Sequence, residues 1–208
     1  MVWKHDTIAG TDGKPRCGWA TADPLYETYH DAEWGRPLRD DRALFELLTL
    51  EGCQAGLSWI TVLRKREHYR KVYDGFEPAK IARYTPAKLA KLLADPGIIR
   101  HKGKIEASVG NARAYLALLE HEGSFSKYLW RFVGGKPRKN SPRSLKDVPT
   151  RSPESDTMSK ALQKAGFKFV GSTICYAFMQ ASGMVDDHIV GCHRHRKSLR
   201  ESSRRKSQ

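Results

Sequence analysis

Apolar residues recur every three or four positions along most of this chain, and this periodicity constrains the fold more than any other feature. After Leu44, for example, Leu47 and Leu48 follow on the same face. Few segments alternate with the period of two that half-buried strands require. We therefore expect an all-α fold, with helices over residues 40–51, 58–74, 85–95, 104–120, 124–133, 154–166 and 172–183.

Local signals mark the ends of several of these helices. Ser58 and Thr85 are suitable N-caps, and Pro86 suits the first helical position because its missing N–H has no partner there in any case. Gly166 suits the position just after a helix, where a left-handed backbone is common.

The two ends of the chain differ in composition from its middle. Residues 1–16 indicate a flexible N-terminal extension, and residues 193–208, HRHRKSLRESSRRKSQ, indicate a basic, disordered tail. Residues 17–192 form the expected folded domain. The Gly/Pro/Ser-rich stretch 134–155 is the best candidate for a boundary inside it.

The chain is strongly basic, with 37 Lys and Arg against 23 Asp and Glu and a formal net charge of +14. The tail carries part of this excess, but the folded body also stays basic. A basic folded body suggests a polyanionic partner, of which nucleic acid is the first candidate. An excess of positive charge that serves only solubility is an equally good explanation.

The lack of a recognisable targeting signal predicts a cytoplasmic protein. No apolar run is long enough to span a bilayer, and MVWKHDTIAGTDGK lacks the apolar core of a signal peptide. In that compartment the four cysteines are expected to be thiols or metal ligands, not disulfides.

Glu51 interrupts the first strong apolar stripe. It occupies the position seven residues after Leu44, where the next core residue is expected. Gly52 and Gly56 follow, before Trp59 resumes the apolar pattern. A carboxylate that faces a core is costly unless something pairs with it, so Glu51 needs a partner that the local sequence does not supply.

The stretch ADPGIIRHKGKI joins two expected helices through a short Pro96-Gly97 turn. This pattern is typical of a helix-hairpin-helix element, in which Gly97 permits the tight backbone and amides at the next helix N-terminus hold a DNA phosphate. A plain corner between two helices is an equally good interpretation of the spacing. The candidate DNA-contacting residues are Gly97, Arg100, Lys102 and Lys104.

Cysteine and histidine residues near both ends suggest a metal site. Cys17 and His30 lie near the N-terminus, and His188 and Cys192 lie four residues apart near the C-terminus. Four sulfur and nitrogen ligands suit a closed tetrahedral zinc site, which would join the two ends of the chain. On spacing alone, buried thiols and hydrogen-bonded histidines explain these residues better.

Aromatic residues gather around the same two segments that hold Cys17 and Glu51. Such clusters usually belong to a core. A pocket with aromatic faces and one carboxylate would also suit a flat cationic nucleobase. The residues are Trp19, Tyr26, Tyr29, Trp34 and Trp59.

Four long motifs resemble the DNA-3-methyladenine glycosylase I family of the helix-hairpin-helix superfamily. They are CGWATADPLYETYHDAEWG, LEGCQAGLSWITVLRKRE, GIIRHKGKIEASVGNARAYL and KFVGSTICYAFMQASGMVDDHIVGC, in this order from Cys17 to Cys192. The resemblance implies a helical glycosylase that hydrolyses N3-methyladenine from alkylated double-stranded DNA, and we expect it to act as a monomer.

The resemblance also assigns roles to residues. It implies a structural zinc ion held by Cys17, His30, His188 and Cys192. It makes Glu51 the carboxylate that recognises the base, and it places Leu57 in the gap that the flipped base leaves. Tyr29 and Trp59 would line the pocket, with Trp19, Tyr26 and Trp34 nearby.

The mechanism that this implies needs little acid catalysis. The stretch SKYLWRFVGGKPRKNSPRS has no acidic residue, so it offers no catalytic aspartate of the kind found in related glycosylases. A cationic methylated purine is already a good leaving group. The enzyme would flip the base, hold it against Glu51 and aromatics, and let water attack the sugar.

One alternative from another class remains open. A zinc-stabilised, non-catalytic DNA-binding module would need the hairpin and the basic body but would leave Glu51 without a role. DNA binding without release of a free base would identify such a module.

Overall fold

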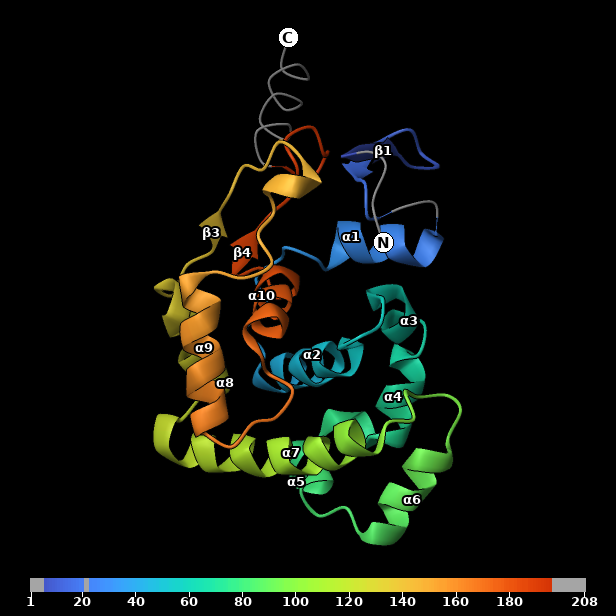
Figure 1. Ribbon diagram of the computed structural model, residues 1–208, viewed down its shortest axis with the longest axis vertical. Helices are drawn as coiled ribbons and strands as arrows, with labels where there is room; N and C mark the ends of the chain where they lie inside the picture. The colour runs from blue at the N-terminus through green and yellow to red at the C-terminus, as the bar shows by residue number, and fades with distance from the viewer. Residues whose placement is uncertain (1–5, 21–22, 196–208) are drawn as a thin grey trace. The chain divides into compact units, whose positions relative to one another are not determined.

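The computed structural model describes residues 6–20 and 23–195, and this part of the chain is mostly helical, as expected (Figure 1). Most of the predicted tail, from residue 196 onward, lies outside the described residues. The chain divides into two compact units. Unit 1 contains Met1–Pro37, Pro137–Thr150 and Gln180–Gln208, and unit 2 contains Leu38–Lys136 and Arg151–Met179.

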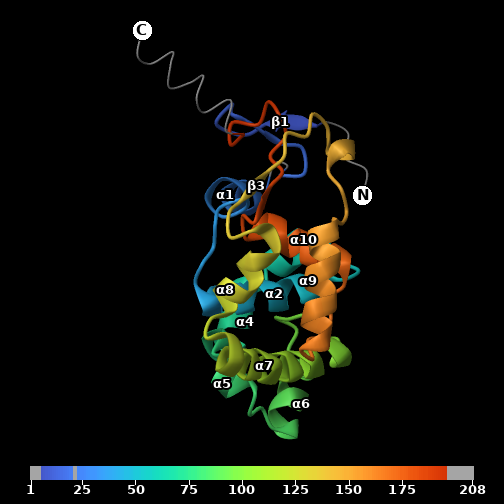
Figure 2. The ribbon, with the colours of Figure 1, turned by 90° about the vertical axis from the view of Figure 1, so that its left-hand side faces the viewer.

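Unit 2 is a helical bundle in which the long helix α7 packs against α2, α5, α6 and α8 (Figure 2). Short 3-10 turns, η1 (Asp74–Phe76) and η2 (Arg131–Val133), complete it. Its helices are α2 (Asp41–Gln54), α3 (Trp59–Leu63), α4 (Arg66–Val72), α5 (Pro78–Ile81), α6 (Pro86–Ala94), α7 (Lys102–Glu122), α8 (Phe125–Trp130), α9 (Pro153–Lys164) and most of α10 (Ser172–Ala181).

Two of the three predicted capping signals mark a helix end as expected. The Thr85 hydroxyl accepts a hydrogen bond from the Lys88 amide (3.3 Å) at the start of α6. Gly166 follows α9 with a left-handed φ of 95°. None of the described helices has the length and apolar character needed to cross a membrane.

The prediction of a single helix over residues 58–74 is wrong. The structure has two helices there, α3 and α4, because the chain tightens at Lys65, whose amide bonds the carbonyl of Val62 (2.9 Å) three residues back. Ser58 precedes α3, but its hydroxyl lies against the hydroxyl of Thr61 (2.7 Å) and makes no capping bond to the backbone.

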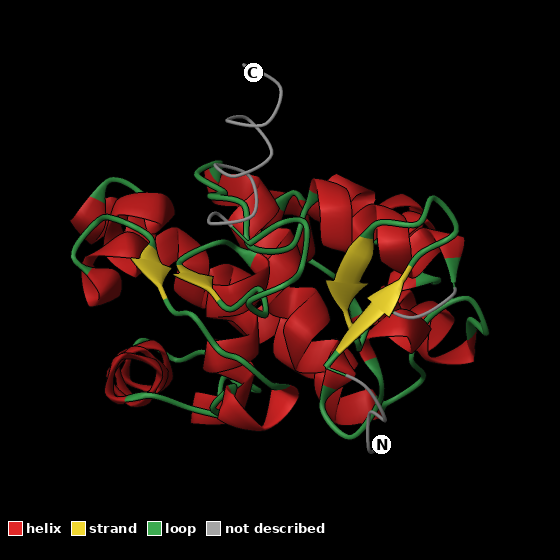
Figure 3. Cartoon of the chain, turned by 90° about the horizontal axis from the view of Figure 1, so that it is seen from above, coloured by secondary structure: helices red, strands yellow, loops and turns green. Residues whose placement is uncertain are grey.

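Unit 1 holds short strands that the helical pattern did not predict (Figure 3). Strand β1 (Thr7–Ala9) pairs antiparallel with β2 (Pro15–Cys17). Strand β3 (Arg138–Lys139) pairs in parallel with β4 (Val185–Asp186). One helix, α1 (Pro24–Ala32), begins at the Asp23 N-cap, whose carboxylate accepts from the Leu25 amide (2.9 Å).

The expectation for the N-terminal extension needs correction. The extension 1–16, predicted to be flexible, contains most of the β1–β2 hairpin, and Arg16 within it is buried. The predicted boundary stretch 134–155 does contain two boundaries between the units, after Lys136 and after Thr150. The segment between them belongs to unit 1: it carries β3 and the 3-10 turn η3 (Leu145–Asp147), and the Leu145 amide bonds the Asp6 carboxylate (2.8 Å). Strands this short leave no readable alternation in a sequence.

Candidate functional site: a buried carboxyl and a cysteine–histidine cluster

Glu51 lies on the apolar face of α2, as the sequence predicts. Leu44 and Leu48 on the same stripe are buried, and Glu51 itself is only 3% exposed. Its Oε2 atom is buried and has no hydrogen-bond partner among the described residues. A buried acceptor without a donor costs free energy, so this atom marks a place where a ligand could supply the donor.

Burial raises the pKa of Glu51 from 4.5 to about 8. Desolvation disfavours the charged form, and it is the cause of this shift. The carboxyl group is therefore largely neutral near neutral pH in the unliganded protein. A cationic ligand bound next to Glu51 would lower this pKa again and favour the ionised carboxylate over the neutral acid.

The C-terminal end of α2 is fixed by Lys104, which reaches it from the first turn of α7. The Lys104 ammonium donates to the carbonyls of Cys53 (2.9 Å) and Ala55 (2.6 Å). A cation at a helix C-terminus satisfies carbonyls that have no partner in the helix and complements its dipole. Lys104 is buried, so the DNA contact predicted for it is wrong; it holds the end of α2 instead.

The loop after α2 presents Leu57 to solvent. Gly56 turns the chain with a left-handed φ of 80°, and Leu57 is 43% exposed. Trp59 is the first residue of α3 and is buried, which agrees with a place in a pocket wall or in the core. A leucine at an exposed loop tip agrees with the wedge role that the resemblance assigns to Leu57.

The turn between α6 and α7 is held by side chains of α4 and of the segment just before it. The Tyr69 hydroxyl accepts from the Ile99 amide (2.9 Å), the Lys65 ammonium donates to the Pro96 carbonyl (2.7 Å), and His68 contacts the Asp95 carboxylate (2.8 Å). Next to this turn, Arg100 and Lys102 are exposed. A Cβ atom on Gly97 would lie 2.2 Å from the His68 ring, so a larger residue here would displace that ring from Asp95.

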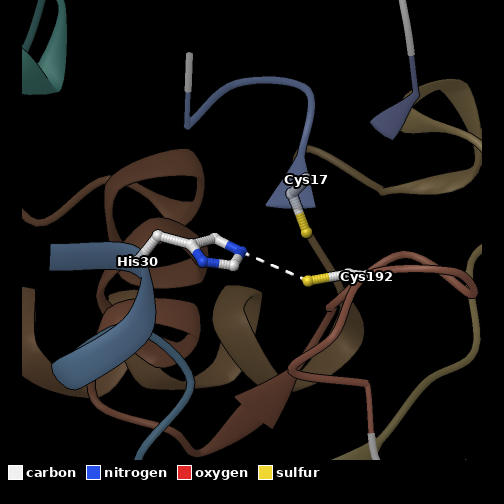
Figure 4. A group of neighbouring side chains, drawn as sticks. All are labelled: Cys17, His30 and Cys192. Atoms are coloured by element: carbon white, nitrogen blue, oxygen red, sulfur yellow. Dashed lines mark hydrogen bonds between the residues drawn. The ribbon is translucent and has the colours of Figure 1, made fainter. Parts of the chain in front are cut away.

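In unit 1, three of the four predicted metal ligands meet. Donor atoms of Cys17, His30 and Cys192 all lie within 4.8 Å of one another, and all three residues are buried (Figure 4). His30 Nε2 is 3.4 Å from the Cys192 sulfur. His188 is outside this group, although its ring centroid is 5.0 Å from that of His30. Its Nε2 atom is buried and has no partner among the described residues.

Two aspartates orient the histidines, and the sequence pattern alone does not mark either of them as part of the cluster. Asp31 Oδ1 is 2.7 Å from His30 Nδ1, and Asp186 Oδ1 is 2.8 Å from His188 Nδ1. Each contact leaves the Nε2 atom of the ring available as a ligand. Carboxylate partners of this kind are the usual outer shell of zinc-bound histidine. Their one signal in the sequence is that each lies within two residues of its histidine.

Asp31 is also the centre of a larger network. It accepts hydrogen bonds from Arg16 (Nη2 to Oδ2, 2.7 Å) and contacts His193 Nε2 (2.9 Å). Burial alone would raise the pKa of Asp31, but hydrogen bonds with Arg16, His30 and His193 outweigh it and hold the pKa below its usual range. The β1–β2 hairpin, α1 and the C-terminal segment are thus connected through one carboxylate.

The two thiols shift each other's pKa in opposite directions. A hydrogen bond with Cys192 and burial raise the pKa of Cys17, while the bond from Cys17 and the contact with His30 lower the pKa of Cys192. Two sulfurs, one imidazole nitrogen and a second buried imidazole with an unpartnered nitrogen form a donor set that fits Zn²⁺. These residues could hold the ion without an open coordination position.

The predicted aromatic residues of unit 1 pack around this cluster. Trp19 lies edge-on to Tyr26 (5.1 Å between centroids) and to Trp34 (4.9 Å). Trp34 stacks near His30 (6.2 Å) and lies edge-on to His188 (4.7 Å). Trp19, Tyr26 and Trp34 therefore support the cysteine–histidine cluster, whichever further role they have. Tyr29 is buried beside Trp19 (6.5 Å).

Comparisons with known proteins identify the class. Residues 19–195 match the family model described as methyladenine glycosylase. The chain is 54% identical over 177 residues to DNA-3-methyladenine glycosylase 1 of Escherichia coli K12, which covers 85% of this chain and 95% of the relative. It is thus a DNA glycosylase, an enzyme of base removal.

Solved structures agree with this result. A crystal structure of 3-methyladenine DNA glycosylase I matches with a TM-score of 0.85 and 54% identity over 86% of this chain and 99% of that one. The Staphylococcus aureus glycosylase, solved to explain 3-methyladenine recognition, matches with a TM-score of 0.82 and 42% identity over 84% and 93% of the two chains. The chain belongs to the methyladenine glycosylase family.

The raised pKa of Glu51 predicts a specific dependence of stability on pH. Below about pH 4.5 the carboxyl is neutral in both the folded and the unfolded protein. Between about pH 4.5 and 8 only the unfolded protein loses the proton, so the free energy of unfolding falls as pH rises, by up to roughly 1.4 kcal/mol per pH unit. In Glu51→Gln this component is absent.

Urea titrations of both proteins across this pH range measure the effect. We expect the variant to gain stability relative to the wild type as pH rises toward about 8. Parallel curves for the two proteins would contradict the raised pKa.

Proposed function

We propose that the chain hydrolyses the N-glycosidic bond of N3-methyladenine in alkylated double-stranded DNA, and that Glu51 recognises the cationic base. One observation carries the assignment to Glu51: its Oε2 atom is buried and has no partner among the described residues, whereas the other buried polar side chain of α2, Thr49, donates to the Phe45 carbonyl. Methylation at N3 gives the adenine ring a positive charge. A cationic base in this pocket would supply the positive partner that a buried carboxylate needs.

The same group explains selectivity. Glu51 can accept hydrogen bonds from the amino edge of adenine, and bonds between charged partners are the stronger ones. Guanine presents the O6 acceptor at that edge, where it would face a carboxyl oxygen. Because a buried polar atom without a partner is penalised heavily, this mismatch excludes guanine more effectively than shape alone.

The chemistry follows from the charge on the base. The bond between C1′ of the sugar and N9 of the base breaks, its electron pair goes to the ring, and 3-methyladenine leaves as a neutral molecule. Water adds to C1′ and loses a proton. The negative charge on Glu51, formed once the cation is bound, stays close while positive charge moves toward the sugar, and no protonated acid is needed on the leaving group.

DNA binding is proposed for the turn between α6 and α7 and for the loop after α2. Arg100 and Lys102 would contact phosphates beside Gly97, in the manner of a helix-hairpin-helix element. Leu57 would fill the space that the flipped nucleotide leaves. For Tyr29 and Trp59, contact with the base remains a prediction.

A structural zinc ion is proposed for Cys17, His30, His188 and Cys192. The donor set and the two carboxylate–histidine contacts support it. Four protein ligands would leave no position for an activated water, so the ion would stabilise unit 1 and take no part in hydrolysis.

The activity is tested by single-turnover release of free bases from methylated duplex DNA, identified by chromatography. We expect Glu51→Gln to lower the rate roughly 10- to 100-fold, because one charge-assisted interaction is lost. Glu46→Gln on the same helix is the matched control and should leave the rate unchanged. Undiminished release by Glu51→Gln would disprove its role, and DNA binding without release by the wild type would favour the non-catalytic module.

The metal is tested by elemental analysis of protein purified without chelators. The wild type should carry about one zinc per chain. Cys192→Ser and His188→Ala should lose it, with an unfolding midpoint lower by roughly 10 °C, since each 1 kcal/mol is worth about 2–4 °C in a chain of this size. Cys175→Ser, which changes a buried thiol outside the cluster, should keep it. A metal-free wild type would refute the proposal.

A further inference from the structure

Phe169, in the loop between α9 and α10, has a left-handed backbone with a φ of 57°. A bulky residue seldom adopts this conformation, which costs free energy and persists only where the surrounding structure imposes it. Phe76 also has a positive φ, of 56°, but its side chain is completely buried, so core packing compensates for the strain. Phe169 is 36% exposed and has no such compensation.

Three buried side chains from three different helices hold the residues on either side of Phe169. The Asn111 side chain on α7 donates to the Lys168 carbonyl (3.0 Å) and accepts from the Lys168 amide (2.8 Å). The Val170 carbonyl accepts from the Ser159 hydroxyl on α9 (2.7 Å) and from the Cys175 thiol on α10 (3.2 Å). The fold therefore fixes the strained conformation, which leaves the ring partly exposed.

Phe169 lies close to the residues that we propose to contact the base and the DNA. A Cβ atom on Gly52, the residue after Glu51, would lie 3.3 Å from both the Cβ and the carbonyl oxygen of Phe169. On its other side, the Phe169 ring meets the His101 ring edge-on (6.1 Å between centroids), and His101 is the N-cap of α7. Phe169 thus lies between α2 and the start of α7, with its ring on the side of His101, next to the proposed phosphate contacts.

We infer that Phe169 is a DNA-contacting residue whose ring stacks on an exposed base of the duplex beside the flipped nucleotide. An aromatic ring at this place can bind a base face of any identity, because every base has one. The contact would help to hold the DNA in the opened state while the hairpin holds the phosphates. This inference rests on the proposed function for its substrate, but the contact itself is measured by binding.

Binding of a duplex with an abasic-site analogue tests the inference without requiring catalysis. We expect Phe169→Ala to weaken it about 10-fold, the usual effect of removing one stacking contact, and Phe169→Trp to restore it. The matched control is Phe132→Ala, a half-buried aromatic of η2, which should not change the affinity. Unchanged affinity of Phe169→Ala would overturn the inference.

Three further readouts separate stacking from a merely structural role. Phe169→Gly should raise the free energy of unfolding, since glycine relieves the strain, and yet weaken DNA binding like the alanine variant. The dependence of affinity on salt should keep its slope in Phe169→Ala, whereas Lys102→Ala should reduce the slope by roughly one. Binding of free 3-methyladenine should be unchanged, and its loss together with DNA binding would mean that Phe169 only positions α2.

The failure of this inference is distinct from failure of the proposed function. If the wild type binds DNA but releases no base, the glycosylase assignment fails, while the affinity comparison still decides the role of Phe169. If bases are released normally and Phe169→Ala binds the duplex like the wild type, only the role of Phe169 is rejected.

Discussion

The functional account depends on one unfavourable arrangement, the burial of the Glu51 carboxyl without a hydrogen-bond partner for Oε2 among the described residues. Burial raises its pKa to about 8, so the unliganded protein holds it largely neutral. A core leucine at this position would stabilise α2 and cost nothing. The carboxyl becomes favourable only when a cation arrives, and a base methylated at N3 is such a cation. In the proposed function, the lower stability at this site is the cost of selectivity for the cationic base.

The surroundings of Glu51 in unit 2 are built to keep it in place. Lys104 fixes the carbonyls at the end of α2, only two to four residues beyond Glu51, from the first turn of the helix that follows the proposed phosphate-binding turn. The strained Phe169 touches the same helix at Gly52. The proposed base contact at Glu51 and the proposed DNA contact at Phe169 therefore lie on neighbouring parts of unit 2. A substitution at Lys104 acts through α2, although the residue resembles a surface DNA contact in the sequence.

The sequence predicted what local periodicity and long motifs can carry. It predicted the helical class, the inward position of Glu51, and the meeting of Cys17, His30 and Cys192. It could not predict the strands of unit 1, which are too short to alternate, nor the break between α3 and α4. It also misassigned Lys104, because charge alone does not tell whether an ammonium faces solvent or a helix end. The partners Asp31 and Asp186 and the backbone of Phe169 depend on tertiary contacts.

The most direct test of the central claim is the ionisation state of Glu51, observed by carbon NMR of the labelled carboxyl group at about pH 6.5, with Glu51→Gln used to assign the signal. We expect a neutral acid in the free protein and a carboxylate in the complex with an adenine methylated at both N3 and N9, which is a permanent cation and has no sugar to lose. A carboxylate already present in the free protein, or a neutral acid that persists in the complex, would contradict this expectation.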